Sequence, residues 1–274
     1  MDTNKAFWQV VEYMRAHWPS KVKPEWQVGL DEYPEILKKA LSDLTVAATR
    51  GRQFIRIAGL SGSGKTSQIL PAVEACSKKK GLMPILVAAR KFVKYHPHYE
   101  EMLAEYGEAN LRKMTDEFST IMLFMTLVEL IRGGYDVVLD VTLLDPVMEG
   151  ILVGLLTEGR YETMMLMIAT SPAVTEHFLD GRGWRHTKET EQEFIRATTK
   201  ALEYYAREAG EMRIILWSVY DKEPIYDGPV KGCLKVFSDY SAREELPARD
   251  DDARREAKVR YLERMASFDR VARL

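Results

Sequence analysis

Hydrophobic positions change their spacing along the chain and mark a central zone between residues 53 and 220. In this zone, short apolar runs alternate with longer amphipathic stretches. Nearly continuous apolar runs are typical of strands that are buried on both faces of a parallel sheet. The predicted strands are residues 54–60, 84–89, 136–141, 163–169 and 213–219.

Helix-length segments separate these predicted strands, at residues 65–79, 98–132, 145–158 and 188–209, with a break near Gly107. Strand–helix alternation with crossovers of this length indicates βαβ units and a parallel sheet. We therefore predict an α/β fold, a three-layer αβα sandwich around a mostly parallel five-stranded sheet. A further candidate edge strand is the segment CLKVF, residues 233–237.

Helical patterns flank this zone on both sides. Apolar positions recur at helical spacing in residues 7–14, 36–44 and 259–268. The predicted organisation is an N-terminal helical appendage at residues 1–50, a central domain at 51–240 and a C-terminal helix at 241–274.

Composition narrows the class of protein. The 274 residues include 39 basic and 41 acidic side chains, a net charge of −2, which argues against a nucleic-acid partner. No apolar run reaches the roughly 18–20 residues of a membrane span. Cys76 and Cys233 are the only cysteines, which excludes a disulfide-rich secreted module. We expect a cytoplasmic protein that binds neither nucleic acid nor a membrane.

The most specific motif spans residues 59–66, which read GLSGSGKT and fit the phosphate-loop pattern G-x-x-x-x-G-K-[ST]. A predicted strand runs into the motif and a helical pattern leaves it. The glycines let backbone N–H groups turn toward phosphate oxygens, and the helix N-terminus adds partial positive charge. ATP is therefore the predicted cofactor. The residues expected to hold it are Gly59, Ser61, Gly62, Ser63, Gly64, Lys65, Thr66 and Ser67.

Two further roles follow from this loop. Lys65 is expected to reach the β- and γ-phosphates, and the Thr66 hydroxyl to bind Mg²⁺. Asp140 ends the third predicted strand, and ligands of such sheets lie beyond the carboxyl ends of the strands. Asp140 is thus a second candidate Mg²⁺ ligand that could also contact the acceptor. The alternative is that Asp140 only caps the following helix.

A basic segment at residues 180–188 lies between two helical patterns. Arg182 and Arg185 are candidates for closing on the phosphates, because a guanidinium stays charged and binds phosphate as a fork. Closure of such a lid would exclude water from the reaction. The alternative is an ordinary solvated basic loop.

The segment around residues 92–107 makes the interpretation more specific, because it resembles the zeta-toxin family of P-loop kinases. That family carries the block D-x-D-x-F-R-x-x-H-P-x-Y after its second strand, and residues 133–143 resemble its next strand. The positions that carry the resemblance are Phe92, His96, Pro97, Tyr99, Tyr106, Gly107, Thr115, Phe118, Ser119 and Thr142.

The resemblance implies a P-loop kinase-like fold and ATP- and Mg²⁺-dependent phosphorylation of a UDP-amino sugar, such as UDP-N-acetylglucosamine, or of another nucleotide. It also implies a toxin that is restrained by an antitoxin, in cis through residues 1–50 or in trans. Arg185 and, less closely, Arg182 match the phosphate-binding arginines of the family. The acceptor-binding residues that the resemblance implies are Arg90, His96, Thr115, Ser119, Asp140 and Thr142.

The chain departs from the family where the D-x-D pair belongs, because Ala88 and Arg90 stand there. The second Asp is the presumed general base of the family, and a guanidinium cannot accept a proton. Three interpretations stay open. In the first, the protein is a kinase in which Asp140 or another carboxylate takes the base or orienting role for a different acceptor, and Arg90 and Lys91 bind a phosphate of that acceptor. In the second, it binds ATP with little transfer. In the third, its nucleotide state controls a protein partner.

Overall fold

The computed structural model describes residues 11–13, 15–16, 20–60, 62–141, 146–179, 188–243, 245 and 251–265. Its centre is a six-stranded sheet of order β2-β3-β1-β4-β5-β6. Strands β1 to β5 are parallel, and β6 pairs antiparallel with β5. The strands are β1 Gln53–Gly59, β2 Ile85–Val87, β3 Val137–Asp140, β4 Glu162–Ala169, β5 Arg213–Ser218 and β6 Tyr226–Pro229.

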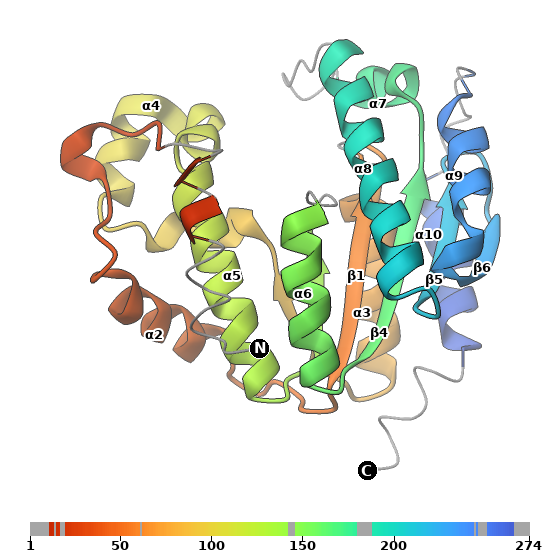
Figure 1. Ribbon diagram of the computed structural model, residues 1–274, viewed down its shortest axis with the longest axis horizontal. Coiled ribbons are helices and arrows are strands. Elements are labelled where there is room, and N and C mark those ends of the chain that lie inside the picture. Colours follow the sequence, from red (N-terminus) through yellow and green to blue (C-terminus); the bar gives the residue numbers. More distant parts are fainter. Residues whose placement is uncertain are drawn as a thin grey trace.

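Helices cover both faces of this sheet, so the predicted three-layer architecture is confirmed (Figure 1). Helices α5, α6 and α8 lie on one face, and α3 and α10 lie on the other. The longer helices are α2 Tyr33–Leu44, α3 Leu70–Lys79, α4 Tyr99–Met114, α5 Asp116–Arg132, α6 Pro146–Glu158, α7 Pro172–Leu179, α8 Lys188–Glu208, α9 Leu234–Ser241 and α10 Asp251–Glu263.

Strand β1 shows how the apolar runs build this sandwich. All seven of its residues are buried. Ile55 and Ile57 pack toward α3 and α10, whereas Phe54 and Ala58 belong to the two clusters on the opposite face. Because side chains alternate between the faces of a strand, a strand buried on both faces needs apolar residues at nearly every position. The one charged residue in the middle of β1, Arg56, therefore needs a special environment.

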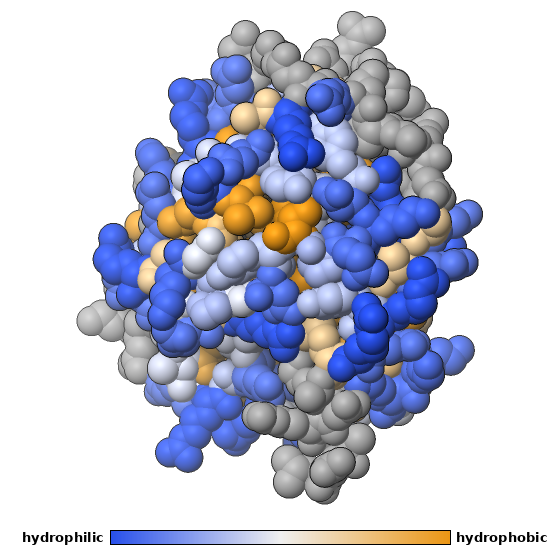
Figure 2. Space-filling view, turned by 90° about the vertical axis from the view of Figure 1, so that its right-hand side faces the viewer, coloured by the Kyte–Doolittle hydropathy of each residue, from blue (hydrophilic) through white to orange (hydrophobic). Residues whose placement is uncertain are grey.

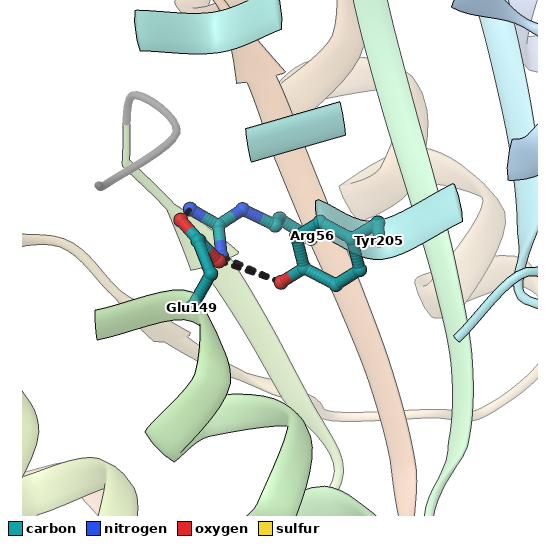
Figure 3. A network of polar contacts seen from close by, with 3 residues as sticks. All are labelled: Arg56, Glu149 and Tyr205. Carbon is teal, nitrogen blue, oxygen red and sulfur yellow. Dashed lines mark hydrogen bonds and ion pairs between the residues drawn. The ribbon is translucent and has the colours of Figure 1, made fainter. Parts of the chain in front are cut away.

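Arg56 lies in a fully buried polar network (Figure 3). Its guanidinium donates from Nη1 and Nη2 to the two carboxylate oxygens of Glu149 in α6, at 2.6 and 2.8 Å. The hydroxyl of Tyr205 in α8 donates to Glu149 Oε2 at 2.6 Å. The network thus ties α6 and α8 to the central strand.

The edge of the sheet differs from the sequence-based prediction. Residues 233–237 do not form a strand, because Leu234–Ser241 is helix α9. Cys233 and Phe237 are buried, whereas Lys235, which would share their face in a strand, is exposed, so the burial pattern is helical. The edge strand is β6 instead, and the Arg213 guanidinium donates two hydrogen bonds of 2.7 Å to Asp227 across it.

The helical flanks lie on different parts of the sandwich. At the N-terminal side, a short 3₁₀ turn, Pro24–Trp26, precedes α2, whose apolar face joins the cluster under α5. At the C-terminal side, α10 packs against α3. The predicted break at Gly107 is confirmed, since this residue has a φ of 70° and interrupts α4.

The surface is largely hydrophilic where β6 and α9 face the viewer, with an apolar patch near the centre of that view (Figure 2). Among the described helices, none combines the length and the apolar character that a bilayer crossing requires.

Candidate active site

The phosphate loop joins the carboxyl end of β1 to a helical turn, Lys65–Ile69, that continues into α3. Gly59 and Gly64 have φ values of 136° and 97°, in the region that favours glycine. A Cβ at Gly59 would lie 2.9 Å from the Ile168 carbonyl oxygen, and one at Gly64 would lie 3.0 Å from Gln68 Nε2. The loop therefore requires glycine at both positions, as the motif predicts.

Lys65 is turned back onto the loop. Its Nζ donates to the carbonyl oxygens of Gly59 and Leu60, each at 2.7 Å. The Ser63 side chain is buried, and its Oγ has no hydrogen-bond partner among the described residues. In the same loop, Thr66 is exposed and Ser67 is half-buried. The loop, residues 59–67, thus carries the Lys65 ammonium and the hydroxyls of Ser63, Thr66 and Ser67 at the end of β1.

The turn after the loop is supported from behind by α10. Lys258 of α10 is fully buried, and its Nζ donates to Gln68 Oε1 at 3.1 Å. The same Nζ lies 5.5 Å from the centre of the Trp217 ring in β5. Because the Gln68 amide also lies next to Gly64, the Gln68 side chain links the C-terminal helix to the phosphate loop.

Asp140 ends β3 beside the strand that enters the loop. It is paired in register with Ile57, two residues before Gly59. Its side chain is only 3% exposed, and its Oδ2 lies 2.7 Å from Nη1 of Arg90, which is 36% exposed. The contact is an ion pair without hydrogen-bond alignment, since Oδ2 has no hydrogen-bond partner among the described residues.

The positive charge beside Asp140 is therefore a structural feature of this chain. Arg90 lies in a 3₁₀ turn, Ala89–Lys91, directly after β2, the edge strand next to β3. Burial, followed by the neighbouring Arg90, lowers the pKa of Lys91. One cation, Arg90, thus stands at the second position of the family's acidic pair, and a second cation, Lys91, follows it directly.

Three other predicted acceptor residues are buried: His96, which lies just before α4, and Thr115 and Ser119, which lie where α4 passes into α5. The His96 ring makes an edge contact with Phe118, at a centroid distance of 4.6 Å. Thr115 Oγ1 donates to the Leu111 carbonyl oxygen at 2.9 Å, whereas Ser119 Oγ has no partner among the described residues. Burial, and next the neighbouring His98, lowers the pKa of His96 to about 4, so its imidazole is neutral near pH 7.

The structure does not bring all predicted acceptor residues into one cavity. His96 and Thr115 line a cavity of about 370 Å³, and the N-terminal segment forms much of its wall through Arg15, Val22 and Tyr33. Arg90 lines a different cavity of about 660 Å³. Four predicted site residues, Ser61, Thr142, Arg182 and Arg185, lie outside the described residues.

The oxygen ligands near Asp140 show whether the site fits the Mg²⁺ ion that the family resemblance implies. No group of three or more His, Cys, Asp or Glu side chains in the described part of the chain could hold a metal ion. The Thr66 hydroxyl and the Asp140 carboxylate are oxygen donors, and Mg²⁺ in phosphoryl-transfer sites needs only one or two protein oxygens beside phosphate and water. These residues therefore fit a nucleotide-bound Mg²⁺, although Arg90 shares the carboxylate.

The parallel sheet, the phosphate loop at its carboxyl edge and the helices on both faces define a P-loop kinase-like fold. The Zeta toxin family model matches residues 40–223, and the chain belongs to this family. This match confirms the resemblance inferred from the H-P-x-Y block. A search of curated proteins gave no match.

Solved structures agree with this fold. One is from work on the PezAT chromosomal toxin–antitoxin system of Streptococcus pneumoniae, with a TM-score of 0.64 and 21% identity, covering 86% of this chain and 96% of that one. Another is the AvrRxo1-ORF1:AvrRxo1-ORF2 complex, with a TM-score of 0.54 and 12% identity, covering 89% of this chain and 88% of that one. At these identities, the likeness shows the fold alone.

Sequence reasoning did not find the residues that support the site from behind. Arg56 carried a signal, because a charge inside an apolar strand run requires a buried partner. Glu149 gave a matching signal, because it is an acidic residue in an otherwise apolar helical stretch. Lys258 carried none, since it lies among the many charges of residues 249–264.

Proposed function

We propose that the chain binds ATP and Mg²⁺ and transfers the γ-phosphoryl group to a hydroxyl of a small acceptor, a UDP-amino sugar or another nucleotide, in the cytoplasm. The observation that carries this proposal is the glycine-dependent loop with Lys65, adjacent in the sheet to a strand that ends in Asp140. In the P-loop kinase fold, the reacting phosphate lies at this edge.

In this proposal, residues 59–67, Ser61 included, hold the triphosphate with backbone N–H groups and hydroxyls. Lys65 exchanges its two backbone carbonyl contacts for phosphate oxygens, which is favourable because a charge-assisted hydrogen bond to phosphate is stronger than one to a neutral carbonyl. Thr66 and Asp140 would hold the Mg²⁺ ion, which would neutralise charge on the phosphates when bound. Arg182 and Arg185 close over the transferring group.

Acceptor binding is assigned to His96, Thr115, Ser119 and Thr142, together with Arg90. Because Arg90 cannot accept a proton, Asp140 takes the base or orienting role for the acceptor hydroxyl. The loss of a dedicated base is tolerable, since positioning and charge stabilisation carry most of phosphoryl transfer. A general base contributes about 10²–10⁴-fold in rate.

The test is a transfer assay with γ-labelled ATP over UDP-sugars, mononucleotides and dinucleotides. Label should appear in at least one acceptor with the wild-type chain and disappear with Lys65→Ala. Lys39→Ala is a matched control, because Lys39 is an exposed lysine on α2, away from the loop. ATP binding without any labelled acceptor would contradict the transfer reaction.

The ion pair between Arg90 and Asp140 favours a second candidate, a family member that binds ATP with little transfer. The variant Arg90→Asp restores the carboxylate of the family and separates the two candidates. A degenerate kinase should gain transfer with Arg90→Asp, whereas a kinase adapted to Arg90 should lose activity toward its own acceptor. A nucleotide-dependent pull-down of a protein, with no transfer in either form, would support an interaction module.

We further propose that residues 1–50 form a unit that restrains the central domain, residues 51–240, in cis. The supporting observation is that the N-terminal segment walls the cavity that holds His96 and Thr115, and that Arg15 lies 3.5 Å from Glu117 there. An antitoxin in trans is the alternative. Weakening the contact with Val22→Asp should raise transfer; unchanged transfer from a folded variant would contradict restraint in cis.

A further inference from the structure

The cavity beside Arg90 has the size and the position of a ligand site. It encloses about 660 Å³, within the range of 300–1,000 Å³ that is typical of small-molecule pockets. Its walls come from the segment 90–95, from the C-terminal half of α4 and from the end of α2. Helices α2 and α4 lie at one end of the molecule, next to α5 (Figure 1).

The cavity is positively charged, although the chain as a whole is slightly acidic. Four cationic side chains line it, and only two acidic ones do. One of the acidic side chains, Asp43, accepts a hydrogen bond of 2.8 Å from the Tyr95 hydroxyl. The cations are Arg90, Lys91, Lys94 and Arg112, and the acids are Asp43 and Glu108.

Burial acts mainly on one of these cations, Lys91, because Arg90, Lys94 and Arg112 are exposed. Lys91 is half-buried, and its charged form is disfavoured by burial and by the adjacent Arg90. A phosphate between these side chains would reverse both effects, because an opposite charge at close range stabilises the ammonium. Arginine and lysine are also the side chains that bind phosphate most often.

Aromatic rings complete the wall. Tyr95 and Tyr99 line the cavity, and Lys94 Nζ lies 4.9 Å from the centre of the Tyr95 ring. Such rings offer a flat face to a planar ring of a ligand. The combination of cations and rings fits a compound that carries both a phosphate and a planar base, and it fits a neutral sugar poorly.

Arg90 connects this cavity to the reacting edge of the sheet. The same guanidinium that lines the cavity lies 2.7 Å from Asp140, on the strand next to β1 and its phosphate loop. A ligand held here would therefore present its other end toward Asp140.

We infer that this cavity binds a nucleoside phosphate through Lys91, Lys94, Arg112 and Arg90, with the base against Tyr95 and Tyr99. The role of this ligand as the phosphoryl acceptor rests on the function proposed above, and it would place the acceptor at Arg90 and not at His96 and Thr115, which line the other cavity. The binding of the ligand does not rest on that function. The family pattern has a carboxylate here that accepts the proton of the acceptor hydroxyl. In this chain, we infer that cations at and beside the same position bind a phosphate of the ligand.

The test is calorimetric titration of the Lys65→Ala variant, in which the phosphate loop is disabled, with uridine 5′-monophosphate. Uridine and inorganic phosphate serve as separate probes for the base and for the anion. The monophosphate should bind more tightly than either probe, and Lys94→Ala in the same background should weaken its binding at least tenfold. Adding Lys38→Ala instead should change nothing, because Lys38 lies outside the cavity on an exposed face of α2.

Equal binding of the monophosphate with and without Lys94 would overturn the inference, and so would no binding at all. Binding of inorganic phosphate alone, with no gain from the base, would overturn the nucleoside part. The result is separable from the proposed function, because transfer is measured independently: cavity binding without transfer would leave the site standing and remove only its role as acceptor site.

Discussion

Two arginine–carboxylate pairs in this chain have the same chemistry and different surroundings. In the pair of Arg56 and Glu149, the side chains are 2% and 0% exposed, and two hydrogen bonds join them. In the pair of Arg90 and Asp140, the arginine is 36% exposed, and one contact joins the two. The first pair lies beneath the helices α6 and α8, and the second lies at the carboxyl edge of the sheet.

The difference separates a pair that is sealed inside the fold from a pair that is accessible at the proposed site. Neither Arg56 nor Glu149 is accessible to water, and each contacts the other and Tyr205. Arg90 keeps access to solvent and to a cavity, so it can exchange Asp140 for a phosphate, which would leave the Asp140 carboxylate open to a metal ion. A sealed pair fixes geometry, whereas an accessible pair can change partners.

The largest expected effect is the loss of the sealed pair. Replacing Glu149 by Ala removes the carboxylate that pairs with the buried Arg56 guanidinium, which should lower the free energy of unfolding by about 3–5 kcal/mol. Chemical denaturation of the purified chain measures this change. The double variant Arg56→Met with Glu149→Leu removes both charges and should recover most of the stability. A Glu149→Ala variant as stable as the wild type would contradict the assignment.

The next effect concerns pH and the buried His96. Its pKa is about 4 in the folded chain and near 6.5 when unfolded, so the unfolded chain binds more protons between these values. Stability should therefore fall by about 3 kcal/mol as the pH drops from 6.5 to 4, because each pKa unit corresponds to about 1.4 kcal/mol. His96→Gln should flatten this part of the stability profile, whereas His98→Gln should retain its slope.

The smallest effect on stability is expected at the accessible pair. Replacing Arg90 by Ala should change the free energy of unfolding by about 1 kcal/mol or less, as for other solvent-accessible ion pairs. It should also free Asp140 and lower the Mg²⁺ concentration that half-saturates ATP binding. Two results would contradict the distinction between the sealed pair and the accessible pair. One is a stability loss as large as that of Glu149→Ala, and the other is an unchanged Mg²⁺ dependence of ATP binding.

Much of the fold could be predicted from the sequence, because buried parallel strands leave long apolar runs. The five parallel strands follow this rule, and the break in α4 follows from a glycine, Gly107, inside a helical pattern. Strand β6 could not be predicted, since an edge strand that contains Gly228 and Pro229 has no apolar run and resembles a turn. The misplaced edge strand at 233–237 has the same origin, because a short apolar run does not distinguish strand from helix.

The site was predictable where a motif fixes the backbone and less so where contacts join distant segments. Residues 59–66 specify their own geometry, so the glycine conformations could be expected. The contact between Arg90 and Asp140 links positions 50 residues apart, and only the order β2-β3-β1 brings them together. The support of Gln68 by Lys258 spans 190 residues and leaves no local pattern.

The central claim is that residues 59–67 form a working nucleotide site. Calorimetric titration of Mg²⁺·ATP into the wild-type chain and into Lys65→Ala tests it most directly, with Lys39→Ala as the matched control. We predict saturable binding by the wild type and by Lys39→Ala, and affinity at least tenfold weaker in Lys65→Ala, because the ammonium that pairs with the phosphates is gone. Equal affinity in all three proteins would contradict the account.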